Sequence, residues 1–215
     1  MSFDALIPLR GGSKGIKNKN IKLLKGKPLC NYVLEACIAS KNINQIWVST
    51  DSTEIIKVVK DLSKEINIIE RPKELSTDTS TTESVLLHAL DMLSATNIIL
   101  LQATSPLTKP EQIDEAINLF KNEKFDSLLR VGKSEKFLWD KSHKPINYDF
   151  QNRKRRQDLD NYYVETGSFY ISKKSFIKES KCRLSGNIGS YTLPAESIFE
   201  IDSIEDWCII EKLLY

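Results

Sequence analysis

Short apolar runs alternate with longer amphipathic stretches along the first 131 residues of the chain. Runs of consecutive apolar residues, such as 97–102 (NIILLQ), are typical of strands that are buried on both faces of a parallel sheet. Stretches with apolar residues three or four positions apart, such as 29–40, are typical of helices that pack on one face. The alternation predicts an open, mostly parallel α/β sheet with helices on both of its faces.

The pattern gives each predicted element a residue range. The predicted strands are 5–9, 45–49, 67–69, 97–102 and 127–131, and the predicted helices are 29–40, 53–62, 81–93 and 109–120. Thr50, Asp51 and Ser52 supply side-chain oxygens suited to capping the second of these helices. Short connections between such strands and helices are typical of this fold class.

The alternation breaks between residues 132 and 161 and then resumes. This segment carries the basic run Arg153 to Arg156 and has no helical periodicity. After it, 162–172 and 190–194 have strand character, 175–179 fits a short helical turn, and 202–214 fits a final helix. We therefore predict a single domain, residues 1–215, with 132–161 as a protruding excursion.

Charge and composition exclude several classes of partner. Lysine and arginine total 31, and aspartate and glutamate total 29, which leaves a formal net charge of +2. This small excess favours neither duplex nucleic acid nor an anionic membrane as a partner. No apolar stretch reaches transmembrane length, and the N-terminus lacks the regions of a signal peptide, so we expect a cytoplasmic protein. The four cysteines form no CxxC pair, and we expect reduced thiols, with Cys30 and Cys37 sharing one helix face.

A glycine-rich loop directly follows the first predicted strand. Open α/β sheets present their ligand crevice at the carboxyl ends of the strands, which is where this loop lies. Gly11 and Gly12 would let backbone N–H groups approach an anion, and Arg10 and Lys14 would pair with phosphate oxygens. The loop matches neither the Walker A nor the dinucleotide GxGxxG pattern. Its spacing alone is also compatible with a tight turn that carries solvated charges.

The run IPLRGGSKGI at 7–16, followed by Lys19, Asn20 and Ile21, closely resembles the signature of the acylneuraminate cytidylyltransferases, the CMP-sialic acid synthetases. Further matching motifs follow in the family's order: VSTD at 48–51, RP at 71–72, TDT at 77–79, LQATSPL at 101–107, GSFYI at 167–171, and IDS at 201–203 with Glu205 and Asp206. Together these motifs span nearly the whole chain.

The resemblance implies a nucleotide-sugar pyrophosphorylase-like fold, the nucleotide-diphospho-sugar transferase fold, with Mg²⁺ as cofactor. The implied reaction transfers CMP from CTP to the anomeric hydroxyl of a nine-carbon 2-keto-3-deoxy sugar acid and releases pyrophosphate. N-acetylneuraminic, legionaminic and pseudaminic acids are the implied acceptors. A homodimer is implied as well, in which the excursion at 132–161 helps to form the neighbour's sugar pocket.

The resemblance also implies roles for individual residues. The residues implied to bind the CTP phosphates are Arg10, Gly11, Gly12, Ser13, Lys14, Lys19 and Asn20. Arg71 and the hydroxyl of Thr82 would face the nucleoside, and Gln102 would meet the sugar acid near its reacting hydroxyl. The implied catalytic set is Arg10, Lys14, Gln102 and Asp202. Arg156 and Gln157 match an Arg-Gln pair of the family, which makes Arg156 a candidate for a contact with the sugar or a phosphate, in place of a solvated surface position.

In-line attack on the α-phosphorus requires positive charge on both sides of the phosphorus, which cations and a metal ion supply. Glu200 and Asp202 lie two residues apart, so on an extended stretch both carboxylates share one side and can bind one Mg²⁺. Asp202 alone also fits a helix N-cap. The general base stays open between a metal-bound water and Asp202.

Several positions depart from the family pattern. Lys17 and Ala103 replace prolines, Glu200 stands where aspartate is usual, and Thr166 replaces a frequent asparagine, which could signal a different sugar. One alternative is the eight-carbon Kdo cytidylyltransferase, whose usual loop differs from residues 10–16. Another is a non-catalytic nucleotide-binding relative, which would be expected to lose Lys14 or Asp202.

Overall fold

The computed structural model describes residues 1–13, 15–158, 162–193 and 198–214. The strands of its main sheet are β1 (Phe3–Pro8), β4 (Gln45–Thr50), β5 (Asn67–Glu70), β6 (Asn97–Leu101), β7 (Ser127–Ser134), β8 (Tyr162–Lys173) and β9 (Ile188–Leu193). The helices are α1 (Leu29–Ala39), α2 (Thr53–Leu62), α3 (Thr82–Ala89), α4 (Pro110–Asn122), α5 (Lys174–Ser180) and α6 (Ile204–Leu213). A small hairpin pairs β2 (Leu23–Leu24) with β3 (Lys27–Pro28), and short 3-10 helices lie at Lys19–Ile21, Lys73–Leu75 and Arg156–Asp158.

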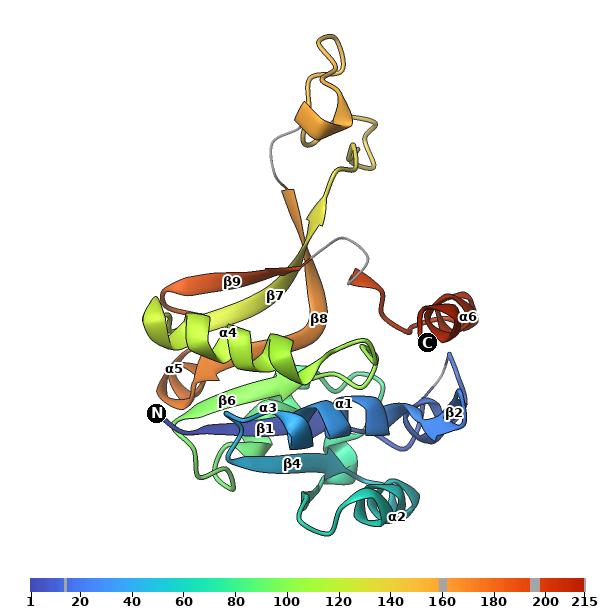
Figure 1. Ribbon diagram of the computed structural model, residues 1–215, viewed down its shortest axis with the longest axis vertical. Coiled ribbons are helices and arrows are strands. Elements are labelled where there is room, and N and C mark those ends of the chain that lie inside the picture. Colours follow the sequence, from blue (N-terminus) through green and yellow to red (C-terminus); the bar gives the residue numbers. More distant parts are fainter. Residues whose placement is uncertain (14, 159–161, 194–197, 215) are drawn as a thin grey trace.

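In the described part of the chain, one sheet of seven strands has the order β5-β4-β1-β6-β8-β7-β9 (Figure 1). The pairs β4–β5, β1–β4, β1–β6 and β7–β9 are parallel, and β8 runs antiparallel to both of its neighbours. The predicted α/β class, with a mostly parallel sheet, is therefore confirmed.

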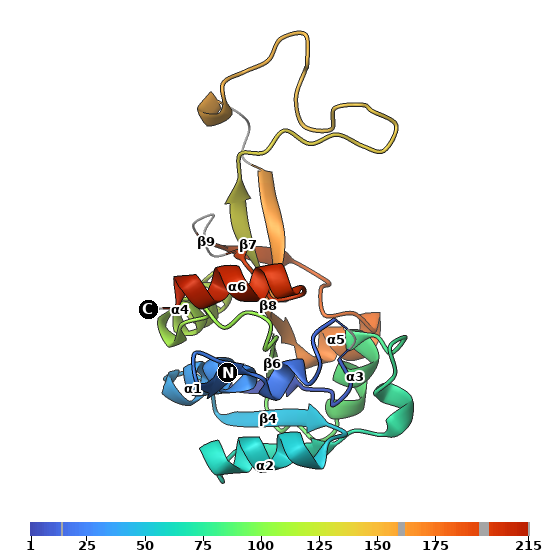
Figure 2. The same cartoon turned by 90° about the vertical axis from the view of Figure 1, so that its right-hand side faces the viewer.

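The buried side chains of the strands alternate between two hydrophobic cores. Ala5 and Ile7 of β1 pack with apolar residues of α1, α2 and α4, whereas Leu6 packs with those of α3 and α5. Successive side chains of a strand leave opposite faces of the sheet, which explains the alternation. Figure 2 shows α3 and α5 on the opposite side of the sheet from α1. A third cluster packs Trp207 of α6 against Leu29 at the start of α1.

The element boundaries follow the sequence pattern closely, with two instructive differences. Helix α2 has the predicted bounds, but α3 ends at Ala89, whereas the apolar spacing predicted a helix to residue 93. Leu90 and Leu93 are buried in the same core, so a turn continues the apolar spacing after the helix has ended. Strand β7 extends to Ser134, beyond the apolar run, because its polar end pairs with the start of β8.

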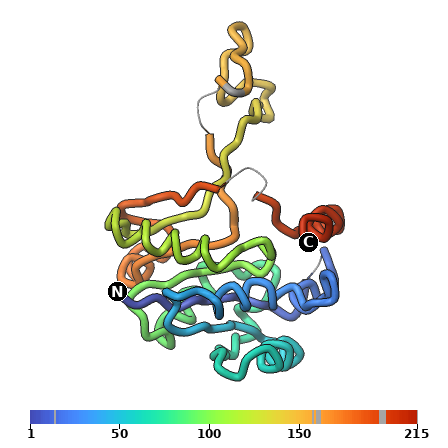
Figure 3. The backbone as a smooth tube through the Cα atoms, viewed as in Figure 1, coloured from blue at the N-terminus to red at the C-terminus, as the bar shows by residue number. Residues whose placement is uncertain are grey.

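Between β7 and β8 the chain leaves the body of the molecule, and we call residues 135–158 the arm. Figure 3 follows the backbone from β7 into this projection. Within the arm the rings of Phe137 and Tyr148 lie 4.4 Å apart, and the Arg153 guanidinium lies 4.2 Å from the Phe137 ring centre. Trp139 and Phe150 remain 49% and 57% exposed. The arm thus has local aromatic packing and an apolar surface that the described chain leaves uncovered.

Two compositional expectations can be compared with the structure. Cys30 and Cys37 are buried on α1, and burial raises the pKa of the Cys30 thiol to about 12. Among the described residues all four cysteines are free thiols, as expected. In the ranges described above, no helix is both long enough and apolar enough to cross a membrane.

Asp126 joins three strands at the edge of the sheet opposite the pocket described below. Its carboxylate accepts hydrogen bonds from the Asn187 N–H at 2.9 Å and from the Lys173 ammonium at 2.6 Å. These two donors hold the pKa of Asp126 below its usual range. We expect Asp126→Asn to lower the free energy of unfolding at pH 7 by about 2 kcal/mol, because a charge-assisted contact is lost.

A depressed pKa gives stability that is fully present above the unfolded pKa of about 3.9 and is lost as the pH falls through the folded pKa. The difference in the free energy of unfolding between wild type and Asp126→Asn, measured by urea titration, should therefore narrow below about pH 4. Asp61→Asn, at an exposed position of α2, is the matched control. A difference that is the same at pH 7 and at low pH would contradict this account of Asp126.

Candidate active site

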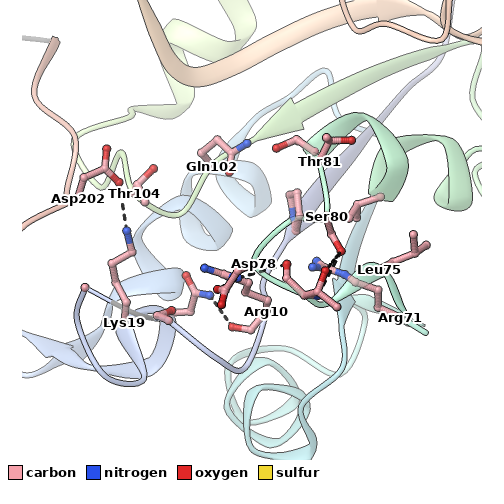
Figure 4. Close-up of a pocket in the computed structure, with 17 residues that line it drawn as sticks. Arg10, Lys19, Arg71, Leu75, Asp78, Ser80, Thr81, Gln102, Thr104 and Asp202 are labelled. Carbon is pink, nitrogen blue, oxygen red and sulfur yellow. Dashed lines mark hydrogen bonds and ion pairs between the residues drawn. The ribbon is translucent and has the colours of Figure 1, made fainter. Parts of the chain in front are cut away.

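A pocket of about 410 Å³ opens where β1, β5 and β6 end (Figure 4). Parallel strands bring their carboxyl ends to one edge, so the loops that follow them converge there. The lining residues are Pro8, Arg10, Ser13, Gly15, Lys19, Asn20, Arg71, Leu75, Thr77, Asp78, Ser80, Thr81, Thr82, Val85, Gln102, Thr104 and Asp202. The predicted site residues in this wall are Arg10, Ser13, Lys19, Asn20, Arg71, Thr82, Gln102 and Asp202.

The glycine-rich loop after β1 is fixed by its neighbours. The Gly11 N–H donates to Asp51 Oδ1 at 2.9 Å, so this donor points at a carboxylate and not into the pocket. A Cβ at Gly11 would lie 3.0 Å from Ser52 Cβ, which explains the glycine by close packing. Gly12 borders a shallower hollow beside the pocket, together with Ser76. The prediction for Lys14 falls outside the described residues.

Arg10 reaches across the pocket to the segment before α3. Its Nη1 donates to Asp78 Oδ1 at 2.8 Å and to the Thr77 carbonyl at 3.4 Å, while its own carbonyl accepts from Asn20 Nδ2 at 2.9 Å. The two side chains of this ion pair are 34% and 43% exposed. Bound phosphate oxygens would have to share or replace the Asp78 contact, because both are acceptors for the same guanidinium.

Lys19 connects the first 3-10 helix to the segment before α6. Its Nζ donates to the Ile201 carbonyl at 2.8 Å and to Asp202 Oδ1 at 3.3 Å. The Lys19 side chain is 16% exposed, whereas that of Asp202 is 77% exposed. The ammonium is therefore held in place, and the carboxylate still faces solvent and the pocket.

Arg71 lies at the floor of the pocket and is buried. Its Nη2 donates to the Ser49 carbonyl at 2.6 Å, and its Nε donates to Ser49 Oγ at 3.1 Å. Burial lowers the pKa of Arg71, the Asp51 carboxylate opposes this shift, and the charge of Arg10 lowers the pKa further. Two guanidinium charges that affect each other in this way would both be stabilised by an anion between them.

Gln102 follows β6 directly and links two parts of the site. Its N–H donates to the Ser168 carbonyl of β8 at 3.0 Å, and two residues later the Thr104 carbonyl accepts from the Ile201 N–H at 2.8 Å. These backbone contacts hold the end of β6 against β8 and against the segment that carries Asp202. Figure 4 shows the Gln102 side chain in the wall between Thr104 and Thr81.

Glu200, the second predicted metal ligand, does not line the pocket. Its Oε1 accepts from Ser105 Oγ at 3.2 Å, and a Cβ at Gly167 would lie 3.1 Å from its Oε2. Burial raises the pKa of Glu200, the Ser105 contact lowers it, and the charge of Asp202 raises it. The two carboxylates are thus close enough to repel each other, which a divalent cation would relieve. Among the described residues no group of three or more Asp, Glu, His or Cys side chains could hold a metal.

The interpretation of Asp202 as a helix N-cap is wrong. Ser203 is the cap residue: its Oγ accepts from the Asp206 N–H at 3.2 Å, and the Asp206 carboxylate accepts from the Ser203 N–H at 2.8 Å. This capping box satisfies the first turn of α6 without Asp202, which leaves the Asp202 carboxylate at the pocket.

Sequence reasoning gave no role to several residues near the pocket. Thr77 and Asp78 line the pocket, and their place in the matched motif at 77–79 was the available signal. Arg130 gave no signal: it is 1% exposed, and its Nε and Nη2 have no hydrogen-bond partner in the described part of the chain. Burial lowers the pKa of Arg130 to about 10, and Glu200 opposes the shift. Arg156 lies on the arm, exposed and outside the pocket wall.

A mostly parallel sheet with a pocket at the carboxyl ends of its strands is the arrangement of α/β proteins that bind a ligand at this edge. The model of the family described as cytidylyltransferase matches residues 5–213, and the chain belongs to this family. N-acylneuraminate cytidylyltransferase A of Danio rerio is 36% identical over 218 residues, which cover 98% of this chain and 50% of that protein. N-acylneuraminate cytidylyltransferase of Streptococcus agalactiae is 32% identical, over 94% of this chain and 51% of that protein. The chain thus spans about half the length of these curated relatives.

A relative of similar length is the pseudaminic acid cytidylyltransferase of Campylobacter jejuni, which is 28% identical over 98% of this chain and 94% of that protein. Among solved structures, a CMP:2-keto-3-deoxy-manno-octonic acid synthetase complexed with CTP has a TM-score of 0.77 at 14% identity, with 100% and 98% of the two chains covered. A 4-diphosphocytidyl-2C-methyl-D-erythritol synthase has a TM-score of 0.70 at 13% identity, with 100% and 99% covered. These likenesses confirm the predicted fold.

The separate roles of Ser203 and Asp202 can be tested by stability alone. Ser203→Ala removes the oxygen that caps α6 and should lower the free energy of unfolding by about 1 kcal/mol in urea titrations. Asp202→Asn changes an exposed carboxylate outside the cap and should shift it by less than about 0.5 kcal/mol. A larger loss of stability for Asp202→Asn than for Ser203→Ala would instead indicate that Asp202 caps the helix.

Proposed function

We propose that the chain transfers CMP from CTP to the anomeric hydroxyl of a nine-carbon 2-keto-3-deoxy sugar acid and releases pyrophosphate. The observation that carries the proposal is the pocket, which Arg10, Lys19 and Arg71 line together with the Asp202 carboxylate. A triphosphate needs several fixed cations, and a reaction at its α-phosphorus also needs a metal-binding carboxylate. Curated relatives named for two different nine-carbon sugar acids support the acceptor class.

In this proposal the two ends of the pocket bind different parts of the reactants. Arg10, Lys19 and the loop at 10–15 bind the phosphates, with Lys14 assigned to the same role by its place in that loop. Arg71 and Thr82 form the nucleoside side. Gln102 lies at the end of β6, where it would orient the sugar hydroxyl for in-line attack.

Asp202 and Glu200 would hold the Mg²⁺ ion, which when bound neutralises charge on the phosphates and the leaving pyrophosphate. The Asp202 charge raises the pKa of Glu200, which supports placing the two carboxylates at one cation. Lys19 holds Asp202 from the side of the first 3-10 helix and so limits the positions that this carboxylate can take.

We further propose that the protein acts as a homodimer in which the arm reaches the pocket of its neighbour. Support comes from apolar side chains that lie exposed on the arm and at the base of β8, namely Leu138, Trp139, Ile146, Phe150, Tyr162, Tyr163 and Val164. An uncovered surface of this kind is typical of an interface. Arg156 on the arm would then contact the sugar acid or a phosphate. The single domain and the cytoplasmic location stay predictions from the sequence.

Purified protein with CTP, Mg²⁺ and each of N-acetylneuraminic, legionaminic and pseudaminic acids should release pyrophosphate with at least one acceptor. Omitting the sugar acid, or replacing Mg²⁺ by EDTA, should abolish the release. Asp202→Asn should bind CTP and lose turnover. CTP binding without release for any nine-carbon acid would favour a non-catalytic nucleotide-binding protein, and release with the eight-carbon acid alone would favour the Kdo enzyme.

The dimer proposal can be tested by mixing two inactive variants, Asp202→Asn and Arg156→Ala. If the arm acts on the neighbour's pocket, each mixed dimer has one intact pocket. Random exchange makes about half of the dimers mixed, so activity should recover to about a quarter of the wild-type value. Absence of recovery while sedimentation shows mixed dimers would exclude the contribution of the arm.

A further inference from the structure

Arg183 lies outside the pocket, in the loop between α5 and β9, yet it contacts the helix that forms one pocket wall. Its Nε donates to Glu83 Oε1 at 2.6 Å. The two side chains are 18% and 30% exposed, so the ion pair is largely shielded from water. The Arg183 contact holds the pKa of Glu83 below its usual range, although burial of the carboxylate opposes the shift.

Glu83 belongs to the first turn of α3, which faces the nucleoside side of the pocket. Thr81, Thr82 and Val85 of this region line the pocket. The buried residues of α3 begin only at Val85 and continue through Leu86 and Ala89. Residues 82–84, at the start of the helix, are therefore only partly buried, and the Glu83 ion pair connects them to the loop that carries Arg183.

The loop that carries Arg183 is itself fixed to the sheet. The Arg183 guanidinium lies 4.9 Å from the ring centre of Tyr170 in β8, and its carbonyl accepts a hydrogen bond from Ser172 Oγ. Two residues later Ser185 exchanges hydrogen bonds with Ser127 of β7, at 2.8 and 3.0 Å. The position of Arg183 is thus set by β7 and β8, and Figure 2 shows α5 beside α3 on this face of the sheet.

We infer that Arg183 is a positioning residue that fixes the nucleoside side of the pocket by anchoring the first turn of α3 through Glu83. This inference rests on the proposed function, because it takes CTP as the ligand of the pocket. Arg183 does not contact the reacting groups. By holding Thr81 and Thr82 in place before the nucleotide binds, it lowers the conformational entropy lost on binding. Loss of the anchor weakens CTP binding and leaves the chemical step intact.

The chain offers a matched control. Lys178 of α5 donates to Asp91 at 2.7 Å, just after the other end of α3, with side chains that are 51% and 82% exposed. This pair joins the same two parts of the molecule at the end of the helix that is remote from the pocket. A general loss of contact between α5 and α3 would affect both pairs, whereas positioning of the pocket wall depends on the Glu83 pair alone.

Steady-state kinetics of Arg183→Ala should show a KM for CTP raised by about tenfold, with kcat changed by less than about twofold. Lys178→Ala should leave both constants at their wild-type values. Glu83→Gln keeps an oxygen acceptor for Arg183 and should recover most of the binding, while Glu83→Ala should match Arg183→Ala. The double variant Arg183→Ala/Glu83→Ala should be no weaker than either single variant, since both remove the same contact.

Hydrogen exchange of residues 80–86 gives a readout that does not depend on turnover, and it should be faster in Arg183→Ala than in wild type or Lys178→Ala. An unchanged KM and unchanged exchange, an equal effect of Lys178→Ala, or a fall in kcat alone would each overturn the inference. If Arg183→Ala fails to fold, Glu83→Ala at the more exposed partner carries the same test. A wild type that releases no pyrophosphate would defeat the proposed function, and the exchange comparison would still decide the anchoring of α3.

Discussion

The parallel pairing of β1 with β4 and β6 is the constraint on which the rest of the structure depends. Together with the parallel pairing of β4 and β5, it brings strand ends to one edge of the sheet, so that Arg10 after β1, Arg71 after β5 and Gln102 after β6 line one pocket. Each loop is then fixed to the next by backbone contacts, such as Leu9 N–H to the Ser49 carbonyl at 2.8 Å. The site is therefore a consequence of strand order, and the side chains supply its charge.

The charges of the pocket are paired within the protein. Arg10 is bound to Asp78, and Lys19 is bound to Asp202. Each pair leaves its carboxylate more than 40% exposed, and ion pairs open to solvent contribute little to stability, so in the proposed reaction a polyphosphate with a divalent cation can exchange with them at small cost. Phosphate oxygens would replace the carboxylates as partners of Arg10 and Lys19, and the cation would bind Asp202. The arrangement keeps the cationic side chains in place before binding without holding them so firmly that binding is prevented.

The sequence pattern predicted the succession of strands and helices because the strands contain short apolar runs and the helices carry apolar residues at helical spacing. Proximity to the pocket was predictable for residues close to the carboxyl ends of β1 and β6, such as Arg10 and Gln102. What the pattern could not predict depends on contacts between distant residues. Gly11 donates its N–H to Asp51, Glu200 accepts a hydrogen bond from Ser105, and Arg183 pairs with Glu83 one hundred positions earlier in the chain. No local spacing encodes these contacts, because they follow from how the sheet folds.

Strand β8 connects the parts of the molecule that the proposed reaction requires. It begins at the base of the arm and ends beside β6, antiparallel to its neighbours. Along its length Gly167 leaves room for the Glu200 carboxylate, Ser168 accepts the Gln102 N–H, and Tyr170 lies against the guanidinium of Arg183. A displacement of this strand would therefore move residues at the proposed metal site, on the sugar side of the pocket and behind the nucleoside wall at the same time. Because one strand carries all three contacts, the arm and the pocket are mechanically connected through β8.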